Sequence, residues 1–454
     1  MKNTSTQTGR YAAIETLCRL QKTAYPVKPL LESVSSESAL SSADRALTMN
    51  LVYGVLRKRQ YLDSLIGQLS RHPLKKLDVF VLNGLRVGLY QIFFLDRIPE
   101  SAAVNETVNA MKAARLPKRL HGFVNGILRE SIRQKQKGTL PSPEDESTAS
   151  LLNHPEWMTR RWSARFGQQE MERICRANNE EPLLTLRANT SRISRENLLD
   201  LFLQDGLDAA IGHYAPDSIV LPCYQGSINK LPGYKEGYFQ PQDEAAQLAA
   251  LLLSPFRENG VYLDGCAGLG GKTSHILQLT QPYSARVIAV EPEPRRQRLF
   301  EDNITRLSDD NRPVLHKKTL QDYSRTSRIL FSGVFIDAPC SGTGVTGRHP
   351  DIRWNRKPED FISYQRIQLE ILNHAAQLVA ENGILVYATC SLEQEENMDV
   401  VTAFLKENEE YNLTDCRPFL PEKCQELIAD NCFSPHPDST IDGFFGARLV
   451  RQRR

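Results

Sequence analysis

The stretch VYLDGCAGLGGKTSH, residues 261–275, decides the fold of the C-terminal half of this chain. A short apolar run ending in Asp264 is followed by a glycine-rich turn, which lets a backbone approach a ligand closely before a helix begins. Two phosphate-binding motifs match this stretch at most of their positions, but each differs from it at one required glycine. A P-loop needs glycine where Cys266 stands, and a GxGxxG run starting at Gly268 meets Thr273 in place of its last glycine. We therefore expect a strand–loop–helix unit that holds a ligand, and we disfavour a nucleotide hydrolase.

Short β-rich runs continue after this unit and alternate with helical stretches. The expected strands are ARVIAVE (285–291), PVLHKK (313–318), GVFIDA (333–338) and GILVYATC (383–390), with helices near 270–280, 294–306 and 358–381. This alternation predicts a mainly parallel, doubly wound α/β sheet with helices on both faces. Ligands of such sheets bind beyond the carboxyl ends of the strands, so the residues after each strand are the candidates for function.

The sequence before this region shows two other residue patterns. Residues 10–135 follow a helical period, with Val104, Val108 and Met111 on one face and prolines between the segments, which predicts an all-α bundle. A Pro- and Ser-rich stretch, 133–150, is typical of a linker, and the pattern up to 235 is a mixture of helix and strand. We expect three parts: a helical domain over 1–138, a linker with a small α+β module over 139–235, and the α/β domain over 236–454.

Composition narrows the class of protein. The chain has 454 residues, of which 41% are apolar and 24% charged, so it reads as a globular protein of several domains. Its net charge of +2 hides a strongly basic first part, because residues 1–138 hold 22 Lys and Arg against 10 Asp and Glu. That imbalance suggests a polyanionic partner. We expect no membrane segment, no secretory signal and a cytoplasmic location. The nine cysteines form no CxxC pair, so we expect neither a disulfide framework nor a metal site.

Acidic residues follow the second and third strands. Glu291 ends the second strand about 20 residues beyond the glycine loop, the usual place for an acid that binds ribose hydroxyls. Asp322 lies beyond the third strand and could reach an adenine, but Thr319 fits that position about as well. The glycine loop and Glu291 together favour a nucleoside-type cofactor.

Cysteines end the fourth and fifth strands, in FIDAPCSGTG (335–344) and YATCSLEQEEN (387–397). Backbone N–H groups at such positions lower the pKa of a thiol, so we expect Cys340 and Cys390 to be reactive and the other cysteines to be structural. A thiolate that adds to carbon 6 of a pyrimidine makes carbon 5 nucleophilic toward a methyl group. One thiol for addition and one group for elimination would use both cysteines, and Asp337 could bind the edge of the base.

Several motifs resemble those of the NOL1/NOP2/Sun family of RNA cytosine-5 methyltransferases. They are GYFQPQDEAAQLAA (237–250), LDGCAGLGGKT (263–273), DAPCSGTG (337–344), RHPDIRW (348–354), YATCSLEQEEN (387–397) and DGFFGARL (442–449). The first part resembles the NusB family of helical RNA-binding factors through residues 85–112 and 121–130. The middle part is similar to an RRM-like module that precedes the catalytic domain in that methyltransferase family. The resemblance therefore implies a multidomain protein: a NusB-like bundle, a small α+β module and a Rossmann-like class I methyltransferase domain.

The resemblance also implies a function and a set of site residues. The activity would be methylation of carbon 5 of a cytosine in 16S ribosomal RNA by a monomer, with S-adenosylmethionine as donor. The cofactor would be held by Cys266, Ala267, Gly268, Leu269, Gly270, Gly271 and Lys272, by Glu291, by Asp322 and by Asp337. Cys390 would attack the base and Cys340 would assist release. The loop departs from the family's usual DLCAAPGGKT, and the loss of its proline at Leu269 frees a dihedral angle and could weaken cofactor binding.

Two alternatives and one RNA contact remain to be weighed. The DNA cytosine-5 methyltransferases attack with the cysteine of the fourth strand, which would make Cys340 the nucleophile. A second alternative is an RNA-binding scaffold with a degenerate methyltransferase domain. The segment GRHPDIRWNRK supplies the basic residues that we expect to hold RNA phosphates, namely Arg348, Arg353, Arg356 and Lys357. Trp354 among them could stack on a base or serve the fold.

Overall fold

The protein divides into two compact units. The computed structural model describes residues 8–23, 25–142, 152–308 and 312–453. The helical unit comprises Met1–Glu180 and Thr346–Asn355, and the sheet unit comprises Glu181–Val345 and Arg356–Arg454. These limits differ from the expected boundaries at 138 and 235, because the helices within 156–179 belong to the helical unit and the strands that follow belong to the sheet unit. The expected boundaries at 138 and 235 stay predictions.

The helical unit is all-α among its described residues, as expected. Its helices are α1 (Gly9–Leu20), α2 (Val27–Glu37), α3 (Ser42–Arg57), α4 (Arg59–Leu69), α5 (Val79–Phe94), α6 (Glu100–Ala113), α7 (Lys118–Gln136), α9 (Glu156–Phe166), α10 (Gln168–Asn179) and α16 (Ile352–Asn355). Their starts follow from local chemistry. Pro26, Pro99 and Pro117 stand at the N-caps of α2, α6 and α7, where a missing N–H costs nothing. The side chain of Asp78 accepts hydrogen bonds from the first amides of α5.

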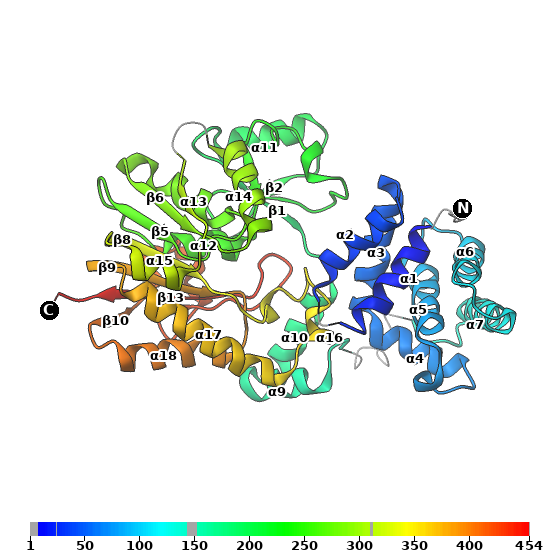
Figure 1. The fold of residues 1–454 in the computed structure, drawn as a ribbon. Helices are drawn as coiled ribbons and strands as arrows, with labels where there is room; N and C mark the ends of the chain where they lie inside the picture. The colour runs from blue at the N-terminus through cyan, green and yellow to red at the C-terminus, as the bar shows by residue number, and fades with distance from the viewer. Residues whose placement is uncertain (1–7, 24, 143–151, 309–311, 454) are drawn as a thin grey trace. The chain divides into compact units, whose positions relative to one another are not determined.

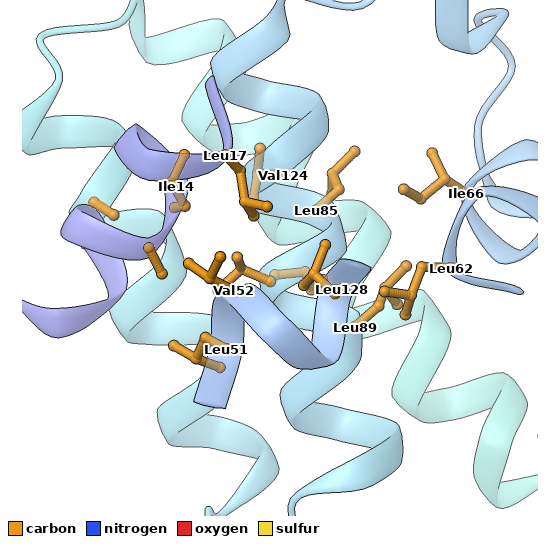
Figure 2. Close-up of a cluster of buried hydrophobic side chains, with 14 of the residues drawn as sticks. Ile14, Leu17, Leu51, Val52, Leu62, Ile66, Leu85, Leu89, Val124 and Leu128 are labelled. Carbon is orange, nitrogen blue, oxygen red and sulfur yellow. The ribbon is translucent and has the colours of Figure 1, made fainter. Parts of the chain in front are cut away.

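One hydrophobic core joins most of these helices. Figure 2 shows side chains from α1, α3, α4, α5 and α7 meeting in it. The predicted apolar face of α6 is confirmed, because Val104 and Met111 are buried and Val108 packs against the core. Val124 and Leu128 of α7 are also buried. The 3.6-residue period of apolar side chains is thus the direct cause of the bundle.

The sheet unit begins with a small antiparallel sheet, in strand order β2-β3-β1-β4. Its elements are β1 (Leu184–Ala188), α11 (Arg195–Gln204), β2 (Ala210–Ile211), β3 (Ser218–Leu221) and β4 (Phe239–Pro241). Apolar residues of these strands and of α11, among them Leu186, Phe202 and Phe239, form a core of their own. The expected α+β module is present.

The second sheet of this unit carries the glycine loop and both cysteine motifs. Its strand order is β11-β12-β13-β9-β8-β5-β6-β7, and β10 pairs with β13. The strands are β5 (Val261–Asp264), β6 (Arg286–Val290), β7 (Val314–His316), β8 (Phe331–Asp337), β9 (Val379–Thr389), β10 (Tyr411–Thr414), β11 (Ile428–Ala429), β12 (Cys432–Phe433) and β13 (Phe445–Arg451). Strands β5 to β9 are parallel, and β13 runs antiparallel to β9. The predicted doubly wound sheet is therefore confirmed.

Helices cover both faces of this sheet. Side chains of α12 (Glu244–Leu251) and α13 (Gly271–Thr280) pack on one face, and those of α15 (Leu320–Thr326), α17 (Pro358–Ala376) and α18 (Met398–Glu407) pack on the other. Figure 1 shows this layering, with α14 (Pro294–Leu307) beside α13. Helix α17 was expected to reach residue 381, but it ends at Ala376, and the strand that follows begins at Val379. In the part of the chain that is described, no helix is long and apolar enough to cross a membrane.

Candidate functional site

The glycine-rich turn connects β5 to α13 and is held by a buried carboxylate. Asp264 is completely buried and accepts hydrogen bonds from Thr273 Oγ1 at 2.6 Å and from Cys266 N at 3.3 Å. These two bonds tie the beginning of the loop to the first turn of α13. Burial raises the pKa of Asp264 from 3.8 to about 6. The sequence analysis quoted this residue without assigning it a role.

Glycine at position 268 is required by the backbone. Gly268 has a φ of +55°, a conformation that strains residues with a Cβ, and a Cβ placed there would meet no atom within 4 Å. Its N–H donates to Glu291 Oε2 at 2.9 Å. The predicted ribose-binding acid is therefore brought to the glycine loop. The open space at Gly268, beside an acid that follows the second strand, fits a nucleoside-type cofactor.

Asp337 at the end of β8 forms an ion pair with Lys272 at the start of α13. Lys272 Nζ lies 2.6 Å from Asp337 Oδ2, and neither side chain is more than a third exposed. Burial acts to lower the pKa of Lys272, but the charges of Asp337 and then of Cys390 outweigh it, so the pKa is raised. The ammonium therefore stays charged beside both groups. The last residue of the predicted cofactor loop and the acid of the fourth strand are thus neighbours.

The two cysteines meet at the carboxyl ends of β8 and β9. Cys340 Sγ and Cys390 Sγ lie 3.2 Å apart, close enough for one thiol to donate a hydrogen bond to the other sulfur. Both cysteines are free and half-buried. Strands β8 and β9 are parallel neighbours in the sheet, which is why cysteines 50 positions apart in sequence reach one another. The prediction that the two cysteines lie close together is confirmed, and their function stays a prediction.

The two thiols have different electrostatic surroundings. The hydrogen bond to Cys390, with burial as the second cause, raises the pKa of Cys340 well above that of an ordinary thiol. The prediction that local N–H groups lower the pKa of both thiols is therefore wrong for Cys340, because the neighbouring sulfur and desolvation outweigh them. Cys390 instead lies within the electrostatic reach of the Lys272 ammonium. The raised pKa of Cys340 keeps its thiol protonated, and either sulfur of the pair can donate the hydrogen bond.

A buried carboxylate lies beneath the cysteine pair. Glu396 has no exposed surface and accepts hydrogen bonds from Ser341 and Ser391, the residues that directly follow the two cysteines. None of these three residues was predicted from the sequence. The available signal was the repetition of Cys-Ser in the two motifs, which has no explanation in the chemistry of a thiol alone.

Asp322 and Thr319 form a helix cap together. Thr319 is the N-cap of α15, its hydroxyl accepts from Asp322 N at 3.1 Å, and it donates to Asp322 Oδ2 at 2.8 Å. Asp322 also pairs with Arg325 and is exposed. Neither residue forms a hydrogen bond to the loop or to Glu291 in the described part of the chain. The assignment of one of them to an adenine stays a prediction.

The residues of the basic segment after the Cys340 loop do not all share one role. Arg353 is completely buried and donates to the carbonyl oxygens of Asn153 and Asn178, and burial lowers its pKa to about 9. Such a buried side chain cannot reach a phosphate, so the structure does not support the prediction that Arg353 contacts RNA. Trp354 likewise serves the fold, because its indole donates to Leu56 O at 2.8 Å and packs against the helical core.

The other basic residues of this segment have different surroundings. Arg356 donates to Ser341 O at 2.9 Å and lies over the ring of Tyr364. Lys357 is exposed at the N-terminus of α17, and Arg348 is half-buried. Their contacts with RNA remain predictions, with Lys357 the most accessible of the three.

The described residues bring no group of three or more His, Cys, Asp or Glu side chains together in a way that could hold a metal ion. Cys266, in the loop, is half-buried, and burial raises the pKa of its thiol. That environment agrees with the expected structural role. The candidate site consists of the cysteine pair, the Lys272–Asp337 ion pair and the carboxylates around the loop.

Comparison with known families matches three segments of the chain. Residues 250–450 match the family described as 16S rRNA methyltransferase RsmB/F. Residues 7–133 match the NusB family, and residues 154–224 match a ferredoxin-like domain of RsmF/B-like methyltransferases. The NusB-like bundle, the ferredoxin-like module and the methyltransferase domain are therefore confirmed as the three recognisable parts.

Whole-length relatives agree with this assignment. The probable ribosomal RNA small subunit methyltransferase B of Bacillus subtilis is 34% identical, in an alignment that covers 98% of each chain. The ribosomal RNA small subunit methyltransferase B of Sodalis glossinidius is 37% identical over 92% of each chain. Among solved structures, the crystal structure of PH0851 superimposes with a TM-score of 0.78 over 98% of both chains, at 21% identity. That last likeness concerns the fold.

Proposed function

The chain belongs to the RsmB/F family of 16S ribosomal RNA methyltransferases, and from that membership we propose that it methylates carbon 5 of a cytosine in 16S ribosomal RNA. The observation that carries this proposal is the separation of 3.2 Å between Cys340 Sγ and Cys390 Sγ at the ends of adjacent parallel strands. Methylation at a ring nitrogen or a ribose oxygen needs no thiol, whereas attack through carbon 5 needs transient addition at carbon 6.

Cys390 is the nucleophile in this proposal. Its sulfur lies 3.2 Å from Cys340 Sγ, which can donate a hydrogen bond to it, and it lies near the Lys272 ammonium, whose positive charge attracts an anionic sulfur. The thiolate bonds to carbon 6, and the electrons of the ring double bond move to carbon 5, which takes the methyl group. The target base must be unpaired or flipped out of its helix before a thiolate can reach it.

Release of the product requires Cys390 to leave. Once the proton on carbon 5 has passed to a base, the ring double bond re-forms and expels the sulfur as thiolate. Cys340 assists this step because its thiol, kept protonated by its raised pKa, donates a hydrogen bond to the departing sulfur. Asp337 is placed three residues before Cys340 and can accept from the amino edge of the cytosine while Lys272 holds it in position.

S-adenosylmethionine would supply an activated methyl group when bound. Glu291 would bind the ribose hydroxyls, and the backbone of the loop from Cys266 to Lys272 would surround the rest of the molecule. The open space beside Gly268 and the carboxylates of Glu291 and Asp337 fit a nucleoside that carries an amino acid and a positive charge. Calorimetric titration of the full chain with S-adenosylmethionine tests this part, and a scaffold with a degenerate domain would give no heat of binding.

Covalent trapping on 16S ribosomal RNA tests the roles of the cysteines. The Cys340→Ala variant should accumulate a protein–RNA adduct that survives denaturing electrophoresis, because addition proceeds and release is slow. The Cys390→Ala variant should form none. An adduct in the Cys390→Ala variant would assign the attack to Cys340, as in the DNA cytosine-5 methyltransferases. That outcome is disfavoured by the raised pKa of Cys340.

A further inference from the structure

The Cys-Ser dipeptide occurs in both motifs, and the two serines have a common partner. Ser341 and Ser391 are completely buried, and both donate their hydroxyl protons to Glu396 Oε2, the bond from Ser391 measuring 2.5 Å. Glu396 lies in a short 3-10 turn, Gln394–Glu396, just after the Cys390 loop. A carboxylate with no exposed surface is rare in proteins unless its charge is paired or fully hydrogen-bonded.

Glu396 receives two further hydrogen bonds at its other oxygen. Oε1 accepts from Ser341 N at 2.8 Å and from Gln368 Nε2, on α17, at 3.0 Å. Gln368 Nε2 also donates to the carbonyl oxygen of Pro339, the residue before Cys340. The carboxylate thus receives four donors from three separate segments, and they occupy its lone-pair positions. Such an arrangement fixes its surroundings in one geometry.

We propose that Glu396 is a positioning residue for the cysteine pair, and that its carboxylate sets the separation of the two sulfurs by binding the serine after each cysteine. This inference rests on the proposed function of the pair. Each serine is joined to its cysteine by one peptide group, so a shift of the serine backbone is transmitted to the cysteine that precedes it. Reacting groups that act in sequence on one base lose rate steeply when they are displaced by about an ångström.

The loops also contact one another directly, which limits what Glu396 must supply. Gly344 N donates to Cys390 O at 3.0 Å, and Leu392 N donates to Thr343 Oγ1 at 2.9 Å. The two serine hydroxyls also contact one another directly, with the oxygens 3.1 Å apart. Glu396 Oε2 accepts from both of these hydroxyls, so the carboxylate fixes the two Cys-Ser dipeptides to a common point in addition to the direct bonds between the loops.

The charge of Glu396 has a second consequence for the pair. Cys390, Glu396 and Asp337 all act to raise the pKa of Cys340, and the rings of Tyr364 and Tyr387 lie within the electrostatic reach of the same thiol. Neutralising Glu396 should therefore lower the pKa of Cys340, in addition to releasing the serines. A residue that only stabilised the fold would change neither the sulfur separation nor this titration.

The test compares Glu396→Gln with the wild-type protein and with Glu407→Gln. The control residue is an exposed glutamate on α18 that contacts Asn373. Glutamine keeps the shape but turns an NH₂ group toward a donor, so we expect kcat to fall about 100-fold while the Kd for S-adenosylmethionine stays within twofold. Alkylation of Cys340 by iodoacetamide, followed by peptide mass, should begin at a lower pH than in the wild type.

Disulfide formation in hydrogen peroxide reports the sulfur separation without any RNA. Two thiols and one peroxide give one disulfide and two waters, and the rate requires the sulfurs to meet. We expect it to fall at least tenfold in Glu396→Gln. Unchanged kcat and unchanged disulfide rate would overturn the inference, as would a loss confined to thermal stability and cofactor binding.

If Glu396→Gln does not fold, two serine variants test the same inference. Ser341→Ala and Ser391→Ala each remove one hydroxyl donor, and each should lower kcat and the disulfide rate about tenfold. Wild-type values in both serine variants would also overturn the inference. If the wild-type protein failed to methylate cytosine, the proposed function would fail, whereas the disulfide rates would still decide the role of Glu396.

Discussion

Lys272 and Asp337 form an ion pair that joins the glycine loop to the first cysteine motif, with Nζ 2.6 Å from Oδ2. Lys272 belongs to the first turn of α13, and Asp337 is the last residue of β8. The same ammonium is within electrostatic reach of Cys390. One side chain therefore connects the expected cofactor loop with Asp337, the acid proposed to bind the base, and with Cys390, the proposed nucleophile.

Replacing Lys272 tests this connection. Lys272→Met leaves the Asp337 carboxylate without its partner and removes a positive charge near Cys390, so kcat should fall about 100-fold. Alkylation of Cys390 at pH 8, measured by peptide mass, should also slow. Lys272→Arg keeps the charge and should lose less than Lys272→Met in both measurements. Equal losses in the two variants would show that the charge is not what matters.

Replacing either of two glycines by alanine should destabilise the protein, for a different reason in each case. Gly268→Ala adds a Cβ in open space but strains a φ of +55°, so the free energy of unfolding should fall by about 1 kcal/mol. Gly344→Ala would place its Cβ 2.2 Å from Gly443 O, and the backbone would have to move. Denaturant unfolding should show a larger loss for Gly344→Ala, and peroxide-driven disulfide formation should change in that variant alone.

Asp264 should make the sheet unit less stable as the pH rises from about 4 to 6. The folded-state pKa of Asp264, about 6, lies above the ordinary value of 3.8, so this carboxyl ionises at a lower pH in the unfolded chain than in the folded protein. The free energy of unfolding should therefore fall by about 3 kcal/mol across that window. Asp264→Asn carries no such loss. The difference in Tm between the variant and the wild type should therefore shift in favour of the variant between pH 4 and pH 7. A pH-independent difference would contradict the raised pKa.

Peroxide should inactivate the enzyme reversibly. Because the sulfurs of Cys340 and Cys390 are 3.2 Å apart, oxidation of either thiol to a sulfenic acid should be followed by attack from the other, with loss of water. Mass spectrometry should find the 340–390 disulfide, and dithiothreitol should restore methylation. In the Cys340→Ala variant no partner thiol is available, so oxidation of Cys390 should proceed to the sulfinic acid instead.

RNA binding should depend strongly on salt through the helical unit. Exposed basic residues gather around the turn from α6 to α7, among them Arg115, Lys118 and Arg119. Replacing these three with glutamine should weaken binding and reduce the slope of log K against log salt by up to about 3. Fluorescence anisotropy of labelled 16S fragments measures both. An unchanged slope would place the phosphate contacts elsewhere on the protein.

Much of the site could be predicted because its positions are set by local patterns. The end of a strand can be located from an apolar run and a turn, and parallel strands bring their carboxyl ends to one edge of a sheet. That reasoning placed Cys340 and Cys390 together, and it placed Glu291 at the glycine loop, where its carboxylate accepts from Gly268. The helical period of the first part likewise gave its buried faces.

What the sequence by itself determined was which residues stand at strand ends and helix starts, since these depend on neighbours within a few positions. Only the tertiary structure decided which side chains share a partner. Glu396 binds Ser341 from 55 positions away, and Arg353 is buried against Asn153 and Asn178 rather than exposed to RNA. Hydrogen bonds and burial of this kind depend on distances between segments that no local pattern specifies, because the chain must fold before those segments meet.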